Sequence, residues 1–158
     1  MKVCIIAIGQ KMPAWAQTAF DDYAKRMPPE WNFSCKALKA EARGSSSVEK
    51  IKQAEAERIL QAIASMGKDT CVVVLDERGK GQTTQQLSQF MGECQNQGQS
   101  VAFIIGGADG LDASVKAAAH RQIRISDLTL PHAMVRVLLT EQIYRAWSLL
   151  VGHPYHRE

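Results

Sequence analysis

Short apolar runs alternate along this chain with stretches in which apolar positions recur every three or four residues. The apolar runs at residues 2–8, 31–38, 70–75, 100–105 and 122–125 predict strands. The periodic stretches at 13–28, 47–66, 83–96, 112–120 and 131–150 predict helices. They begin at Pro, Ser, Thr or Asp residues typical of helix starts, and either Thr83 or Thr84 opens the third. This alternation predicts an α/β fold with a mostly parallel sheet flanked by helices.

Three predicted loops combine polar residues or glycines in a way that favours a binding site. They span residues 76–81, 106–110 and 126–132, and each follows one of the last three predicted strands. Ligands of parallel α/β folds bind beyond the carboxyl ends of the strands, so a small-molecule site is expected there. The turn at 106–110 matches neither a dinucleotide nor a P-loop fingerprint, and a purely structural tight turn is the alternative. Leu128 and Leu130 predict that the third loop is buried.

The final helix and the tail carry a second group of candidate residues. The helix is apolar on nearly all sides, which predicts burial on most faces and contact with a second subunit. Glu141 and Arg145, four residues apart, can form a structural ion pair or a polar wall facing a substrate. The tail at 153–158 favours fraying by its composition, although Tyr155 could stack on a base and Arg157 could contact phosphate.

Composition narrows the class of protein. The 158 residues, 46% hydrophobic, predict a single domain spanning 1–158. The longest apolar runs have five residues, which predicts no membrane span, and the four cysteines lack metal-ligand spacing, which predicts no metal site. A reduced, cytoplasmic protein is expected. The net charge of +3 comes from basic ends and an acidic middle, so an anionic partner is permitted.

Six motifs in chain order resemble the RlmH family, small SPOUT-type methyltransferases that act on the large ribosomal subunit. They are Leu75-Asp76, Ile104-Ile105-Gly106-Gly107 with Gly110, Leu128-Thr129-Leu130-Pro131-His132, Val135-Arg136-Val137-Leu138, the run from Glu141 to Ser148, and the tail from His153 to Glu158. The resemblance implies a C-terminal trefoil knot, a homodimer and the cofactor S-adenosyl-L-methionine (SAM). It also implies methylation of N3 of a pseudouridine in 23S rRNA on assembled ribosomes.

The resemblance also assigns roles to residues of this chain. The cofactor-binding set is Leu75, Gly107, Ser126, Asp127, Leu128, Thr129, Leu130 and Pro131. The set expected to be catalytic, near the acceptor base, is Glu141, Arg145, His156 and Arg157, with Tyr155 and Arg157 contacting RNA. N3 must lose a proton, and His132, Glu141 and His156 are the candidate acceptors. Ala108-Asp109 departs from the Pro-Glu of many relatives, which leaves the role of residue 109 open.

Two other functions stay open at this point. The chain could be a non-enzymatic RNA-binding protein of the ribosome whose glycine loops are structural. Alternatively, it could methylate another RNA, such as a tRNA. A net charge of +3 is small for tight binding to free RNA, because affinity increases with the number of phosphates neutralised. This favours an RNA substrate within the assembled ribosome.

Overall fold

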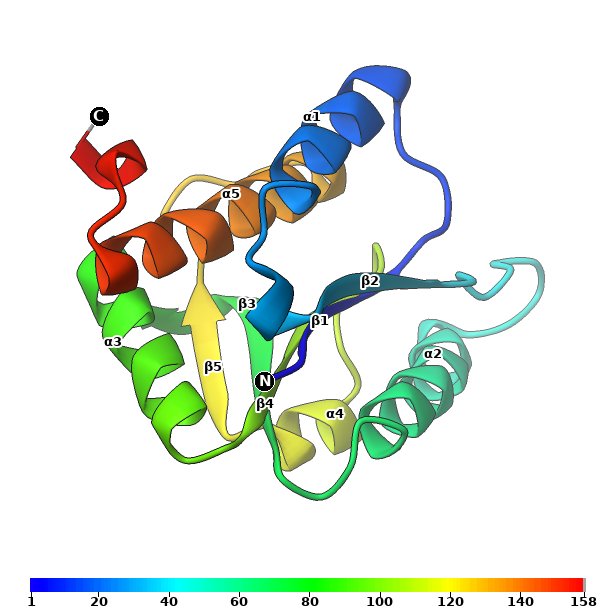
Figure 1. The fold of residues 1–158 in the computed structure, drawn as a ribbon. Coiled ribbons are helices and arrows are strands. Elements are labelled where there is room, and N and C mark those ends of the chain that lie inside the picture. The colour runs from blue at the N-terminus through cyan, green and yellow to red at the C-terminus, as the bar shows by residue number, and fades with distance from the viewer. Residues whose placement is uncertain (158) are drawn as a thin grey trace.

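A five-stranded parallel sheet forms the centre of the protein. The computed structural model describes residues 1–157. The strands are β1 (Val3–Ile8), β2 (Phe33–Leu38), β3 (Thr70–Gly81), β4 (Ser100–Ile105) and β5 (Arg121–Arg124), in the order β2-β1-β4-β3-β5. Every pairing is parallel, which confirms the predicted α/β class (Figure 1).

Helices cover both faces of this sheet. The helices α1 (Ala14–Ala24), α3 (Thr84–Asn96) and α5 (His132–Val151) pack on one face, and α2 (Val48–Ala64) and α4 (Ala113–Ala118) pack on the other (Figure 1). Two 3-10 turns, η1 (Pro29–Trp31) and η2 (Pro154–Arg157), complete the order of elements. Alternate residues of β1 and β4 enter the two apolar cores, as expected for strands buried on both faces.

Side-chain caps explain where three helices begin. The Ser47 hydroxyl accepts a hydrogen bond from the Lys50 amide at 3.2 Å, and Thr83 forms a capping box with Gln86. Asp112 caps α4 through the Ser114 amide at 3.0 Å. These caps satisfy amide groups that the first turn of a helix leaves without partners, and they confirm the predicted starts.

Two boundaries differ from the sequence prediction. Residues 76–81, predicted as a loop, continue β3, and Ile123 of β5 pairs with both Leu75 and Lys80 across an irregularity. The reason is long-range pairing, which local composition does not encode. Trp31, predicted to begin a strand, lies in η1 fully buried, and its indole donates to Gln95 Oε1 at 3.0 Å.

The last helix is buried on most faces, as predicted, and most of this burial comes from the chain itself. It packs between α1 and α3 against the sheet. Leu150 and Val151 stay 41% and 55% exposed at its end. Contact with a second subunit therefore stays a prediction, as does the trefoil knot.

Within residues 1–157, no helix has the length and apolar character needed to cross a bilayer. The same residues contain no group of three or more His, Cys, Asp or Glu side chains arranged to hold a metal ion.

Candidate functional site

A cavity of about 520 Å³ opens at the carboxyl ends of β4 and β5, beside residues 75–77 in the middle of β3. Its volume lies within the range of roughly 300–1,000 Å³ that is common for small-molecule sites. The lining comes from the three segments singled out above, together with residues of α2, α4 and α5. It comprises Lys52, Leu75, Asp76, Glu77, Ile105, Gly106, Gly107, Ala108, Asp109, Gly110, Leu111, Lys116, Arg124, Ile125, Ser126, Asp127, Leu128, Thr129, Leu130, His132 and Val135.

The structure brings almost all of the expected cofactor-binding residues to this cavity. Leu75, Gly107 and residues 126–130 line it, whereas Pro131 stands outside the lining as the residue that precedes α5. The predicted burial of the loop was wrong, because Leu128 is 77% exposed. Apolar character predicts that a side chain needs covering, but it does not reveal whether the protein itself covers it. Leu128 instead stands at the cavity as an apolar surface available to a ligand.

The glycine turn after β4 gives the cavity a wall made of backbone. Gly110 has φ +83°, and its amide donates to the Gly107 carbonyl at 3.1 Å. A Cβ on Gly106 would stand 2.8 Å from Leu111 Cδ2, and one on Gly107 would stand 2.9 Å from Glu55 Oε1. A side chain at either position would require Leu111 or Glu55 to move, and the absence of side chains here lets main-chain groups face a ligand.

Charged side chains from helices complete the lining, and sequence reasoning missed several of them. Lys52 lies on α2 and Lys116 on α4, and neither belongs to a recognisable motif. Lys116 Nζ lies 2.9 Å from Asp76 Oδ2. Arg43 pairs with Asp109 at 3.0 Å, which gives residue 109 a bond to the loop before α2. Because the topology brings these helices to the cavity, only the fold reveals them.

Asp76 is a lining residue whose pKa is shifted by its hydrogen bonds. A hydrogen bond from the Arg78 amide and, after it, one from Lys116 hold the pKa of this carboxyl below its ordinary value. We expect Asp76→Asn to reduce the free energy of unfolding at pH 7 by about 1 kcal/mol. A depressed pKa stabilises the fold above the unfolded-state value of about 4, and that contribution disappears as the pH falls through the folded-state pKa.

Urea unfolding of wild type and Asp76→Asn at pH 7 and pH 3 measures this effect. The difference between the two proteins should shrink at pH 3. A difference that is the same at both pH values would contradict the assignment of the shift to the ionised carboxylate.

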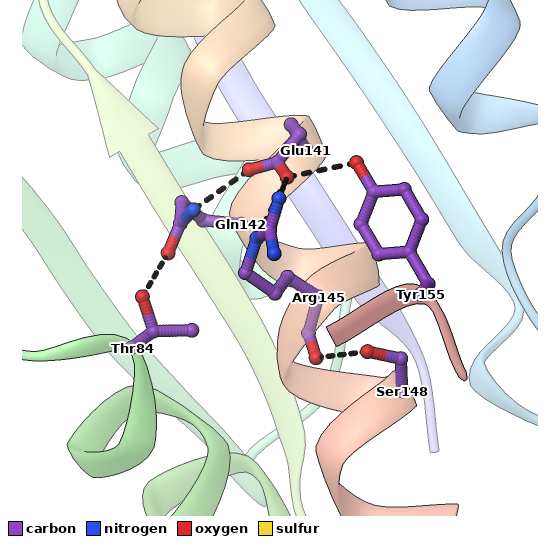
Figure 2. Close-up of polar contacts among 6 residues, drawn as sticks. All are labelled: Thr84, Glu141, Gln142, Arg145, Ser148 and Tyr155. Atoms are coloured by element: carbon purple, nitrogen blue, oxygen red, sulfur yellow. Dashed lines mark hydrogen bonds and ion pairs between the residues drawn. The ribbon is translucent and has the colours of Figure 1, made fainter. Parts of the chain in front are cut away.

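Three of the residues expected near the acceptor base, Glu141, Arg145 and Tyr155, form a second cluster on α5 and the tail (Figure 2). Glu141 Oε1 accepts hydrogen bonds from the Tyr155 hydroxyl at 2.8 Å and from Arg145 Nε at 2.9 Å. Its Oε2 accepts from Gln142 Nε2 at 2.7 Å, and Thr84 donates to Gln142 at 2.7 Å. The guanidinium carbon of Arg145 lies 4.8 Å from the centre of the Tyr155 ring. Burial and the bond to Glu141 raise the pKa of Tyr155, so its hydroxyl is a hydrogen-bond donor at physiological pH.

The tail is docked on this cluster, so the fraying favoured by its composition was wrong. The Tyr155 ring lies 4.7 Å from that of Tyr144, and His153 lies 5.6 Å from Trp147. Aromatic contacts and the bond to Glu141 hold η2 against α5, which the composition of the tail alone could not reveal. His156 Nδ1 is buried and has no hydrogen-bond partner within residues 1–157, while Arg157 is exposed.

The cavity and the cluster occupy different parts of α5. His132 lines the cavity at the start of the helix, and Glu141 lies nine residues later. At about 1.5 Å per residue, the two are separated by roughly 13 Å along the helix axis. The structure thus gathers the predicted residues into two sets, and neither Glu141 nor Arg145 lines the cavity.

A parallel α/β sheet with a cavity at the carboxyl ends of its strands defines a class of proteins that bind small molecules. Comparison with known proteins narrows this class. Residues 1–156 match the family described as "Predicted SPOUT methyltransferase". The chain is 60% identical to ribosomal RNA large subunit methyltransferase H of Acidovorax sp. (strain JS42) and 59% identical to the protein of that name from Variovorax paradoxus (strain S110), with full coverage of both chains in each case. The chain belongs to the SPOUT methyltransferase family, which confirms the resemblance to the RlmH family.

Proposed function

We propose that this chain, as a single domain of residues 1–158, transfers a methyl group from SAM to N3 of a pseudouridine in 23S rRNA. The assembled ribosome in the cytoplasm is the proposed substrate. The observation that carries this proposal is the cavity, because the loops chosen from sequence as cofactor contacts line it together. The names of the relatives, which specify ribosomal RNA of the large subunit, support the choice of substrate.

The residues of the cavity fit this cofactor in their chemistry. Leu75, Ile105, Leu128 and Leu130 offer apolar contacts for an adenine ring, and the backbone of the glycine turn offers hydrogen-bonding groups for its edge. The lining carries both carboxylates and cations, and three of its carboxylates are already paired: Asp76 with Lys116, Asp109 with Arg43 and Asp127 with Arg124. When bound, SAM supplies a methyl group on a sulfonium that is a good leaving group. The chain's own task is to hold the methyl group in line with the attacking nitrogen.

The hydrogen bonds of the structure separate the three candidate proton acceptors. His132 Nε2 lies 3.1 Å from Arg136 Nη2, and the ring also bonds to the backbone of Gly106, so both its nitrogens are occupied. Glu141 accepts bonds on both oxygens and thereby fixes Arg145 and Tyr155. His156 Nδ1 has no partner among the described residues, but it is buried, so its missing partner does not rank it above Glu141, and these two residues stay the candidate acceptors.

A homodimer is part of this proposal, because the cavity and the cluster of one chain lie apart. In the dimer, the cluster of one subunit meets the cavity of the other. Exposed apolar side chains at Trp15 and Val151 favour such contacts. Mixing a cavity variant, Thr129→Trp, with a cluster variant, Glu141→Gln, tests the arrangement. Mixed dimers should regain activity that neither variant has alone, and absence of this rescue would contradict a site shared between subunits.

Two measurements test the function itself. Isothermal calorimetry should detect SAM binding to the purified chain, and a protein that gives no heat would support the non-enzymatic alternative. Mass mapping of RNA from a deletion strain should then reveal a missing methyl group on a pseudouridine of 23S rRNA. A loss confined to tRNA would assign the enzyme to another substrate. Equal activity on a short isolated rRNA hairpin would contradict the requirement for the assembled ribosome.

Leu128→Ser tests the role of the exposed loop in donor binding. The variant should bind SAM about tenfold more weakly, because burying a leucine against a ligand contributes roughly 1.5 kcal/mol. Its folding stability should be unchanged, since Leu128 is 77% exposed. Val48→Ser is the matched control, because Val48 is 49% exposed on α2 and outside the cavity. Unchanged SAM affinity in Leu128→Ser would remove this residue from the donor site.

A further inference from the structure

Arg136 is a buried cation that the proposed chemistry leaves without a role. Its side chain lies on α5 with 3% exposure, and its Nε is buried without a hydrogen-bond partner. Among residues 1–157, no carboxylate forms an ion pair with it. Burying a guanidinium without a counter-ion costs free energy, because an unpaired charge is more stable in water than inside a protein.

The contacts of Arg136 lead to the wall of the cavity. Its Nη2 donates to the carbonyl of Gly9, directly after β1, at 2.9 Å and to His132 Nε2 at 3.1 Å. His132 lines the cavity, and so does Gly106, whose backbone bonds to the histidine ring. One guanidinium therefore joins the end of β1, the start of α5 and, through His132, the end of β4.

The hydrogen-bonding chemistry of Arg136 and His132 fixes which nitrogen of the histidine carries the proton. An arginine can only donate, so His132 Nε2 is the acceptor and carries no proton. The proton of the neutral ring then sits on Nδ1, which faces the Gly106 backbone. Burial and, after it, the positive charge of Arg136 lower the pKa of His132, which keeps the ring neutral at physiological pH.

The surroundings of the pair do not offset this charge. Cys35 of β2 is near enough to Arg136 for each group to act on the pKa of the other, and burial raises the pKa of the Cys35 thiol to about 11, so this thiol is neutral at physiological pH. Among the described residues, Arg136 is the charged group that acts on the pKa of His132. Titration of this histidine therefore reports on Arg136 directly.

We propose that Arg136 is a positioning residue for the methyl-donor cavity: acting through His132, it holds the Gly106 turn and the start of α5 in the arrangement that binds the donor. This inference rests on the proposed function for the identity of the ligand. The link between Arg136, His132 and Gly106 is a property of the protein without ligand, and it can be measured there.

A double-mutant cycle on donor binding tests whether Arg136 acts through His132. Arg136→Met and His132→Asn should each weaken SAM binding, measured by calorimetry, by roughly tenfold. The double variant should bind no more weakly than either single variant, because both remove the same link. Arg26→Met, which breaks an exposed ion pair with Asp22, is the control and should leave SAM binding unchanged. Effects of the two substitutions that simply multiply would overturn the proposal.

Nitrogen NMR of the His132 imidazole tests the link between Arg136 and His132 in the absence of SAM. In the wild-type protein, His132 should have an unprotonated Nε2. Arg136→Met should raise the pKa of the ring, and the proton of the neutral ring should no longer be held on Nδ1. An Nε2-protonated ring in wild type, or a ring unaffected by Arg136→Met, would overturn the inference. Arg136→Lys serves as a second variant in case Arg136→Met folds poorly. It keeps the positive charge and a hydrogen-bond donor, so the pKa of His132 should lie between the values for wild type and Arg136→Met. Failure of wild type to bind SAM would refute the proposed function instead, leaving the NMR result to decide on Arg136.

Discussion

Deletion of residues 153–158 is expected to abolish methyl transfer to ribosomes while the affinity for SAM stays at its wild-type value. The deletion removes Tyr155, whose hydroxyl donates to Glu141 at 2.8 Å, and His156, a candidate proton acceptor. It leaves every residue that lines the cavity in place. Transfer is measured with radiolabelled SAM on ribosomes from a deletion strain, and donor affinity by calorimetry.

Tyr155→Phe provides a matched control for the deletion. It removes one hydrogen bond to Glu141 but keeps the ring against Tyr144 and beneath Arg145, so partial activity is expected. Thermal unfolding of both variants shows whether the tail also stabilises the fold. A deletion that loses SAM affinity or unfolds would indicate a structural tail, and one that keeps full activity would exclude the tail from the reaction.

Gly79→Ala is expected to have the largest effect on folding of any single substitution considered. A Cβ at this position would stand 2.5 Å from the carbonyl carbon of Ile123 and 2.7 Å from its amide nitrogen. These are backbone atoms of β5, which cannot move aside as a flexible side chain can. We expect a loss of about 3 kcal/mol or more in the free energy of unfolding, measured by urea denaturation.

Gly92→Ala is the matched control for this prediction. Its new Cβ would meet Leu150 Cδ2 at 2.9 Å, the end of a flexible side chain that is partly exposed. Alanine also favours the helical conformation of α3 over glycine, by about 1 kcal/mol, so little net change is expected. Comparable destabilisation of the two variants would contradict the close backbone contact between β5 and residues 76–81.

The position of Gly79 connects folding to the site. Arg124 of β5 donates to the Gly79 carbonyl at 2.8 Å and pairs with Asp127 at 2.6 Å. Arg124 and Asp127 both line the cavity. The close approach of the β3 and β5 backbones at Gly79 therefore holds β5 and the loop after it at the cavity.

Local patterns predicted the elements and their order well. Ser47 and Asp112 were identified as helix starts from residue type and spacing, and Thr83 was one of two candidates with Thr84; all three make side-chain caps. The strand runs were also found, apart from the start predicted at Trp31, because apolar runs between turn residues reflect burial in a parallel sheet. The continuation of β3 to Gly81 was missed, since it depends on pairing with β5, more than 40 residues away.

The candidate site was predictable where one segment carried several of its residues. Residues 126–130 and the glycine turn were found because they follow strands. Lys52 and Lys116 were missed, and so was the exposure of Leu128, because each depends on which distant elements meet at the cavity.

The sequence by itself determined the α/β class, the family and the identity of the candidate residues, because strand and helix periods and motif spacing are local properties of the chain. Only the tertiary structure decided that these residues form two separate sets, that the tail docks on Glu141, and that Arg136 is buried against His132. The physical reason is that hydrogen bonds and burial between segments far apart depend on strand order and helix packing, which no single stretch of sequence specifies.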